Sequence, residues 1–411
     1  MDLEGKVIHQ GETQMKNPRR TILFFAGLLC LISATAKCRS VKAPTSHLKM
    51  RFQEALDSLR TQYRFPGATA AYILPDGTIG AAATGLADVE LNIPMTPESR
   101  MLAASIGKTF VGATVLALAM EGVLTLDDPI SKWLGDRSWF ARLPHHEAIT
   151  LRHLLNHSSG ISNHVETEGF REHFLGTSMS LAEPLSPEGL VSFILDQPAL
   201  FAPGRGWAYS DTGYILVGLI IEAATCLDFY EHVTRRFLEP LQLSLTSPSD
   251  RPDLPGLAAG YTAPGDPFGL PAKTTLRPGV MAWHPGIEGA GGGFISNPKD
   301  LVVWAKALYE GRAMTGNYLD ELLRSVPISP DDPGNRYGIA VSIRSEAAPA
   351  PSWGHGGWIP GYCSSLRYYP DRGVAVAFQI NTDIGVIDHS TPLIPDMENR
   401  LANLVLETIS K

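Results

Sequence analysis

Strand-like segments stand near both ends of this chain, with mainly helical segments between them. The runs GATAAYIL (67–74) and TIGAAATG (78–85) flank Pro75-Asp76-Gly77 and predict a β-hairpin. Three further strand-like runs lie towards the C-terminus: RYGIAVSI (336–343), CSSLRYYP (363–370) and GVAVAFQI (373–380). Helical periods precede the hairpin (48–64) and follow the last strand (393–410). We therefore expect an α+β fold, in which an antiparallel sheet built from both termini is flanked by helices and a mainly helical lobe (124–289) is inserted.

Composition narrows the class of protein. Hydrophobic residues make up 44% of the 411 residues and charged residues 18%, which is enough apolar surface for a substantial core. The formal net charge is -8, so no excess of lysine and arginine is available to neutralise phosphates. The sequence therefore predicts a folded protein with no nucleic-acid partner.

The N-terminal region has the pattern of an export signal. The run TILFFAGLLCLISATA (21–36) is almost wholly apolar, follows basic residues between Lys16 and Arg20, and ends in Ala34-Thr35-Ala36. We expect a signal peptide over residues 1–36, with Met15 as an alternative start, a linker over 37–47 and a single folded domain over 48–411. The predicted location is secreted or periplasmic.

Contact with a membrane is expected only through this N-terminal region. An uncleaved signal anchor and a lipid attached to Cys38 remain open alternatives, although Lys37 stands where a lipidation site would want a small residue. Cys226 ends an apolar helical run and Cys363 opens a strand-like one. Both are expected to be buried as small hydrophobic residues.

A serine and a lysine three residues apart mark the first candidate for chemistry. Ser105-Ile106-Gly107-Lys108 leads into the apolar run TFVGATVLALAM, so a helix starting near Ser105 would place the hydroxyl and the amine on one face. Two other Ser-x-x-Lys matches, at 46–49 and 296–299, lack that context. A lysine accepts the serine proton only if its pKa falls well below about 10.4. Gly107-Lys108-Thr109 does not make a phosphate-binding loop, because Leu102 stands where the loop needs glycine.

Two histidines stand at a spacing that could hold a zinc ion. His153 and His157 are four residues apart, but the residues between them do not form a His-Glu-x-x-His box. We expect structural histidines, no metal and no cofactor.

Two later segments supply further candidates. Tyr209-Ser210-Asp211 stands at a junction between a loop and an apolar helix, where a tyrosine can project into a cleft. Further on, Trp353-Gly354-His355-Gly356-Gly357-Trp358 places glycines on both sides of a histidine, and glycine lets a backbone come close to a bound molecule. The long Pro- and Gly-rich connection over 247–289 is expected to form a cleft wall.

In this order, the three motifs resemble those of the serine β-lactamase and penicillin-binding-protein superfamily. The resemblance is greatest to its branch of class C β-lactamases, D-alanyl-D-alanine carboxypeptidases, D-aminopeptidases and related esterases. It extends to four flanking segments: GVLTLDDPI (122–130), ITLRHLLNHSSGI (149–161), YSDTGYILVG (209–218) and GAGGGFISNPKDL (289–301). The resemblance implies a β-lactamase/transpeptidase-like fold over nearly all of residues 48–411.

By this similarity, Ser105 would be the nucleophile and Lys108 its proton acceptor. Tyr209 would relay a proton to or from the leaving group and the incoming water. The backbone N–H groups of Ser105 and Trp358 would form the oxyanion hole. Asp211, His355, Gly356 and Gly357 would contact the substrate.

Two residues depart from the usual motifs. Asp211 stands where asparagine is commoner, and a carboxylate beside Lys108 would raise the pKa of the lysine. Three explanations would reconcile Asp211 with a lysine base: Asp211 points away, Asp211 is protonated, or Tyr209 takes more of the base role. His355 stands where many members have lysine, which weakens the case for binding a substrate carboxylate by a fixed positive charge.

The sequence therefore predicts an exported serine hydrolase that forms an acyl-enzyme on a small-molecule or peptide substrate. A D-amino-acid peptide, as in a D-Ala-D-Ala carboxypeptidase, or a β-lactam amide is expected as acyl donor. Two alternatives remain open: a carboxylesterase of the same fold, and a penicillin-binding receptor that is acylated without turnover.

Overall fold

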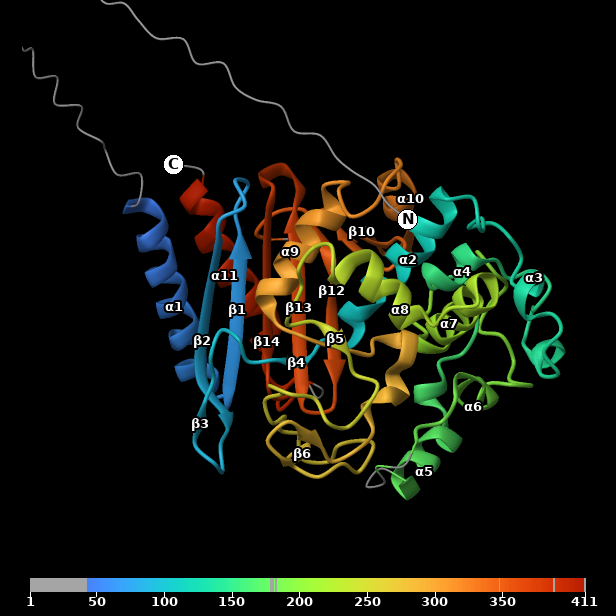
Figure 1. Ribbon diagram of the computed structural model, residues 1–411, viewed down its shortest axis with the longest axis horizontal. Coiled ribbons are helices and arrows are strands. Elements are labelled where there is room, and N and C mark those ends of the chain that lie inside the picture. The colour runs from blue at the N-terminus through green and yellow to red at the C-terminus, as the bar shows by residue number, and fades with distance from the viewer. Residues whose placement is uncertain (1–42, 178–180, 182, 347, 387–388, 410–411) are drawn as a thin grey trace, which may run out of the picture. The chain divides into compact units, whose positions relative to one another are not determined.

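The computed structural model describes residues 43–177, 181, 183–346, 348–386 and 389–409 (Figure 1). Its helices are α1 (Ala43–Tyr63), α2 (Lys108–Met120), α3 (Ser131–Leu134), α4 (Leu151–Leu155), α5 (Glu168–Thr177), α6 (Pro187–Ser192), α7 (Asp211–Thr225), α8 (Phe229–Val233), α9 (Pro298–Tyr309), α10 (Leu319–Leu323) and α11 (Leu393–Ile409). Shorter helical turns are η1 (Ala104–Gly107), η2 (Phe140–Arg142), η3 (His164–Glu166), η4 (Thr234–Leu238), η5 (Pro285–Gly291) and η6 (Pro370–Arg372). The predicted signal peptide, the alternative start Met15 and Cys38 lie outside the described residues, as does most of the predicted linker.

The main sheet is antiparallel and combines strands from both ends of the chain. Its strand order is β3-β2-β1-β14-β13-β12-β11-β10-β9. The strands are β1 (Gly67–Ile73), β2 (Ile79–Asp88), β3 (Ile93–Pro94), β9 (Val326–Ser329), β10 (Asp332–Tyr337), β11 (Ser342–Arg344), β12 (Ser352–Ile359), β13 (Tyr362–Tyr369) and β14 (Val374–Ile380). β1 pairs with β14 in the register Ala68 to Ile380. The predicted α+β fold, with a sheet built from both termini, is confirmed.

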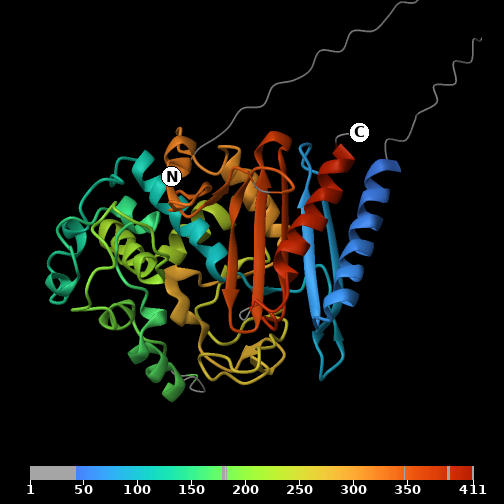
Figure 2. The same ribbon diagram turned by 180° about the vertical axis from the view of Figure 1, so that it is seen from behind.

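Helices cover both faces of this sheet, which explains why β1, β13 and β14 are buried along their whole length. α1 and α11 pack on one face, where Phe52 and Leu401 belong to one apolar cluster with Phe378 (Figure 2). α9 covers the other face (Figure 1). There Trp304 stacks on Phe110 of α2 with ring centroids 4.3 Å apart.

The helical lobe, which contains α3 to α8, lies beside the sheet at the right of Figure 1. Two small sheets connect the loops next to the lobe. One consists of β4 (Met101–Leu102), β5 (Ser247–Pro248) and β8 (Phe294–Ser296), and the other of β6 (Thr275–Arg277) and β7 (Val280–Met281). The connection over 247–289 therefore contains ordered strands and turns.

Two local expectations were wrong. The run 336–343 is two strands, because Ile339 and Ala340 leave the sheet and pack against α2, where a β-carbon on Gly112 would stand 2.8 Å from the Ala340 side chain. The apolar helical run that leads to Cys226 does end there, because Cys226 caps α7 in the left-handed conformation (φ 58°). Cys226 is exposed and Cys363 is buried, so the expected burial holds only for Cys363.

Candidate active site

The turn that carries Ser105 is held against the main sheet. The Ser364 hydroxyl of β13 donates to the carbonyl of Ala103 at 2.8 Å, and the Gln379 amide of β14 donates to the carbonyls of Met101 and Leu102. Ala104 has a φ of 51°, a left-handed conformation that costs a non-glycine residue about 1–3 kcal/mol. The fixed, strained turn places Ser105 at the start of the helical segment that continues as α2.

The Ser105 hydroxyl lies between two side chains that the sequence had singled out. Lys108 Nζ is 3.1 Å from Ser105 Oγ, and Tyr209 Oη is 2.8 Å from it. The expected placement of the serine and the lysine on one helical face is thus found. Both neighbours are within the reach needed for proton transfer to or from the hydroxyl.

Lys108 is fully buried and paired with a carboxylate. Its Nζ lies 2.5 Å from Asp211 Oδ1, donates to the carbonyl of Gly291, and stands 5.0 Å from the centre of the Tyr209 ring. Burial works against the charged lysine, but the attraction of Asp211 and Tyr209 outweighs it and raises the pKa of Lys108 above its ordinary value. In the resting site, Lys108 is therefore an ammonium.

Asp211 begins α7, behind the N-cap Ser210, whose hydroxyl accepts from the backbone N–H of Gly213. Burial alone would favour the neutral acid, but the charge and hydrogen bond of Lys108 lower the pKa of Asp211. The Asn163 amide also donates to Asp211 Oδ2, at 3.4 Å. Asp211 thus neither points away from Lys108 nor is protonated. Of the three explanations that the sequence left open, a larger base role for Tyr209 remains.

Tyr209 packs in an aromatic group that fixes its ring. Its centroid is 4.2 Å from that of His157, whose Nδ1 accepts from the backbone N–H of Ser210. Burial raises the pKa of Tyr209 above its ordinary value even though Lys108 acts in the opposite direction. Burial also lowers the pKa of His157, with Lys108 and His355 adding to the effect, so this histidine is neutral.

Strand β12 passes directly beside the serine turn. A β-carbon on Gly357 would stand 2.4 Å from the carbonyl oxygen of Ala103 and 2.3 Å from Ser364 Oγ, so only glycine permits this approach. The next residue, Trp358, lines the pocket together with Ser105. The close packing places β12 beside the helical turn that carries Ser105. The oxyanion hole of the Ser105 and Trp358 N–H groups stays a prediction.

His355 is buried in β12 and carries no charge. Its Nδ1 donates to the carbonyl of Gly356, and its Nε2 accepts from the Tyr337 hydroxyl at 2.6 Å. Burial, reinforced by Lys108, lowers the pKa of His355 to about 3. This histidine therefore offers no positive charge to a substrate carboxylate. His355, Gly356 and Asp211 all line a wider cleft that is continuous with Ser105.

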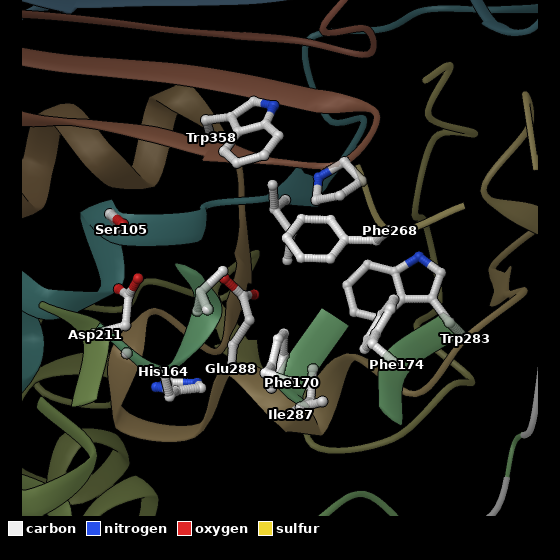
Figure 3. Close-up of a pocket in the computed structure, with 14 residues that line it drawn as sticks. Ser105, His164, Phe170, Phe174, Asp211, Phe268, Trp283, Ile287, Glu288 and Trp358 are labelled. Atoms are coloured by element: carbon white, nitrogen blue, oxygen red, sulfur yellow. The ribbon is translucent and has the colours of Figure 1, made fainter. Parts of the chain in front are cut away.

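A pocket lined largely by apolar residues, several of them aromatic, opens beside Ser105 and is called the aromatic pocket below (Figure 3). Its apolar lining comes from three parts of the chain: Val165, Phe170 and Phe174 of the helical lobe, Phe268, Trp283 and Ile287 of the long connection, and Trp358, Ile359 and Pro360 of the β12 end. Its polar lining is Ser105, His164, Asp211 and Glu288. The prediction that the connection forms a cleft wall is borne out by this arrangement.

Two residues of the site were missed by the sequence analysis. Asp383 is fully buried and accepts from the Trp358 indole at 3.1 Å and from the backbone N–H of Gly361 at 3.0 Å, while its other oxygen accepts from the N–H of Ala263. Glu288 points into the pocket from η5 (Figure 3). Neither belongs to a recognisable motif, although Glu288 directly precedes the glycine-rich segment Gly289–Gly293.

The described ranges contain no cluster of three or more His, Cys, Asp or Glu side chains that could hold a metal ion. His153 instead bonds to Thr150 within the cap of α4. No single helix there has the length and apolar composition to cross a bilayer, and only α7 taken together with 229–238, bent by 80°, passes that test.

Comparison with known proteins decides the family. A model of the Beta-lactamase family matches residues 52–391. The chain belongs to the beta-lactamase family. The resemblance seen in the three motifs is thereby confirmed, and the protein belongs to the β-lactamase and penicillin-binding-protein superfamily.

Individual relatives of this family member have different names and activities. Penicillin-binding protein 4* of Bacillus subtilis is 24% identical over 311 residues, which cover 73% of this chain and 64% of the relative's length. Esterase EstB of Burkholderia gladioli is 26% identical over 377 residues, 84% of this chain and 93% of the esterase. The D-stereospecific amidohydrolase from a Streptomyces species is similar in structure, with a TM-score of 0.70, 29% identity, and coverage of 82% of this chain and 94% of that one.

Proposed function

We propose that the protein hydrolyses amides of D-amino acids through an acyl-enzyme formed on Ser105. The observation that carries this proposal is the position of Ser105 Oγ, between Lys108 Nζ and Tyr209 Oη at the mouth of the aromatic pocket. The named activity of the D-stereospecific amidohydrolase from Streptomyces supports the substrate class.

Acylation begins when Ser105 Oγ attacks the substrate carbonyl carbon and gives up its proton. The carbonyl oxygen becomes an oxyanion, which accepts hydrogen bonds from the backbone N–H groups of Ser105 and Trp358. The proton then passes to the departing nitrogen, the C–N bond breaks, and an amine leaves. A water repeats the attack on the ester, yielding the carboxylic acid and restoring the serine hydroxyl.

Tyr209 takes the larger share of the base role. Because the ion pair with Asp211 keeps Lys108 protonated, a free lysine amine is not available to accept the serine proton. A tyrosinate at position 209 would be stabilised by the ammonium of Lys108 beside it. The form of the site that can attack the substrate therefore lacks the Tyr209 proton of the resting site. Activity is expected to rise with pH until Tyr209 has lost this proton.

The neutral state of His355 favours amides over the substrates of a carboxypeptidase. A carboxypeptidase must hold the free carboxylate of its substrate, and the position where many relatives have lysine provides no charge here. An amide whose leaving group is small and uncharged needs no such contact.

A carboxylesterase is the second candidate. The likeness to EstB extends over 93% of that esterase, and the largely apolar lining of the pocket suits the acyl group of an ester. The same Ser105 chemistry would apply, with an alcohol in place of the amine as leaving group.

The test compares the full chain with Ser105→Ala on four kinds of acyl donor: a D-amino-acid p-nitroanilide, short-chain p-nitrophenyl esters, a D-Ala-D-Ala peptide and a chromogenic cephalosporin. Turnover of the anilide that disappears in Ser105→Ala supports the proposal. Faster turnover of esters than of any amide would favour the esterase. A stable Ser105 adduct without turnover would favour a penicillin-binding receptor, and unchanged activity in Ser105→Ala would refute the mechanism.

We further propose that the protein acts outside the cytoplasm, in the periplasm or the medium. The support is the basic and apolar pattern over residues 16–36. Fractionation of expressing cells, with mass spectrometry of the N-terminus, is expected to find a chain that starts at Lys37. A full-length protein in the cytosolic fraction would contradict this location.

A further inference from the structure

One acidic side chain of the aromatic pocket has no part in the proposed mechanism. Glu288 lies in η5, and its carboxyl group points into the pocket between the polar residues near Ser105 and the aromatic wall (Figure 3). It is separate from the ion pair, because Lys108 bonds to Asp211, Ser105 and the carbonyl of Gly291.

Glu288 lies next to the turn that carries the nucleophile. A β-carbon on Gly292 would stand 3.1 Å from Glu288 Oε1 and 2.6 Å from the carbonyl oxygen of Ala104, the residue before Ser105. The absence of a side chain at Gly292 thus lets this carboxyl group approach the serine turn. A substrate bonded to Ser105 would have the first atoms of its acyl group near Glu288.

The carboxyl group lacks a donor in the resting site. Glu288 Oε2 is buried and has no hydrogen-bond partner within the described residues. A buried oxygen without a donor costs free energy, which a ligand that supplies the donor recovers. Burial raises the pKa of Glu288 to about 8, with Asp211 adding to the effect and Lys108 opposing it. With this raised pKa, the Glu288 carboxyl group is protonated in the resting site near neutral pH, and a bound cation would favour its ionised form.

The surrounding rings also suit a cation attached to an apolar body. Phe170, Phe268 and Trp283 line the pocket, and aromatic faces attract ammonium groups as well as apolar side chains. A substrate with an amino group on the carbon next to its carbonyl would bring both features together.

We propose that Glu288 binds a free primary ammonium group on the acyl half of the substrate, while the aromatic pocket takes the attached side chain. The inference rests on the proposed function and narrows it: the preferred substrates are amides of unblocked D-amino acids with large apolar side chains. N-acylated amino acids, β-lactams with acylated amines and simple acyl groups bind less well.

The test uses three p-nitroanilides with one carbon skeleton: D-phenylalanine, N-acetyl-D-phenylalanine and 3-phenylpropanoic acid. We expect wild-type kcat/KM to be about 10- to 100-fold higher for the free amine than for the deamino compound, the range of a charge-assisted hydrogen bond. In Glu288→Gln this ratio falls to about one. The control Glu222→Gln replaces another partly buried glutamate, on α7 and outside the pocket lining, and keeps the wild-type ratio.

Inhibition of the wild-type chain gives a second reading that needs no variant. With p-nitrophenyl 3-phenylpropanoate as substrate, 2-phenylethylamine is expected to inhibit at least about tenfold more strongly than 2-phenylethanol, because only the amine carries the charge. Equal inhibition by the two compounds would overturn the inference.

The possible outcomes distinguish a failure of the Glu288 role from a failure of the proposed hydrolase function. Turnover of the ester by wild type but not by Ser105→Ala, together with an unchanged ratio in Glu288→Gln, overturns the role of Glu288 and leaves the acyl-enzyme in place. No turnover of the ester or of any anilide overturns both. A higher rate for the N-acetyl compound than for the free amine also overturns the inference.

Discussion

The helical lobe and the main sheet meet at Ser105 but contribute different chemistry. The lobe supplies side chains that carry protons or charge: Tyr209 contacts the serine, Asp211 pairs with Lys108, and Asn163 supports Asp211. The sheet supplies position, because Ser364 and β12 hold the serine turn from the other side. Proton chemistry can therefore vary through single substitutions in the lobe, while changes on the sheet side move the reacting atoms.

The lobe side is tested most severely at Tyr209. Replacing Tyr209 by phenylalanine removes the hydroxyl 2.8 Å from Ser105 Oγ, and kcat/KM is expected to fall by about 10²- to 10⁴-fold, the usual contribution of a positioned acid or base. Steady-state kinetics on the best substrate provide the measurement. Tyr309→Phe is the control, since that buried hydroxyl on α9 has no partner within the described part of the chain. A loss below about threefold in Tyr209→Phe would mean that Lys108 alone moves the proton.

The sheet side is tested at Asp383, a positioning residue. Asp383→Asn turns one of its three accepted hydrogen bonds into a clash of donors, so we expect about 1–3 kcal/mol of lost stability and a smaller loss of kcat than in Tyr209→Phe. A double-mutant cycle with Trp358→Phe separates the two roles. If Asp383 acts through the indole, the two losses in kcat are not additive. Strictly additive losses would assign Asp383 to stability alone.

Asp211 tests the charge that the lobe contributes, because asparagine removes the charge of this side chain with little change of its shape. Asp211→Asn is expected to retain much of the activity and to lower the pKa of Lys108, because the carboxylate that stabilises the ammonium is gone. Besides burial, the Asp211 carboxylate also raises the pKa of Tyr209, so the acidic limb of the kcat/KM profile, which reports loss of the Tyr209 proton, should move to lower pH. Complete loss of activity in a folded Asp211→Asn protein would show that the ion pair itself is required.

The smallest expected effect concerns stability and pH. Glu288 has its pKa raised from 4.5 to about 8, so the folded protein keeps a proton that the unfolded chain loses between these values. Stability therefore falls as pH rises through this window. Glu288→Gln lacks this loss, and its Tm relative to wild type should increase from pH 5 to pH 8. The Tm of Glu98→Gln, a variant at an exposed position, serves as the control for the substitution itself. A flat difference for Glu288→Gln across this range would contradict the raised pKa.

Local patterns were enough to predict the hairpin, the terminal strands and the helical face shared by Ser105 and Lys108. These features depend on residue periodicity, which the chain carries within each segment. The break at Ile339 and Ala340 could not be predicted, because those residues leave the sheet for a space beside Gly112 that only tertiary packing creates. Residue periodicity likewise does not predict the left-handed backbone conformation of Cys226.

The candidate site shows the same division. Motif order was enough to bring Ser105, Lys108 and Tyr209 together, and the structure places them within hydrogen-bonding distance. Glu288 and Asp383 were missed because each acts through neighbours that are remote in sequence. The direction of Asp211 also could not be read from its motif, since it depends on where α7 begins relative to α2.

The pairing of β1 with β14 has a consequence for the order in which the molecule assembles. During synthesis, the hairpin of β1 and β2 emerges long before β14, so one edge of β1 stays unpaired until β14 has been made. The helix that covers this part of the sheet beside α1 is α11, which follows β14 in the chain. Contacts between such distant segments slow folding. A ribosome that stops before β14 would release a chain with an open, apolar strand edge, a ready substrate for aggregation or proteolysis.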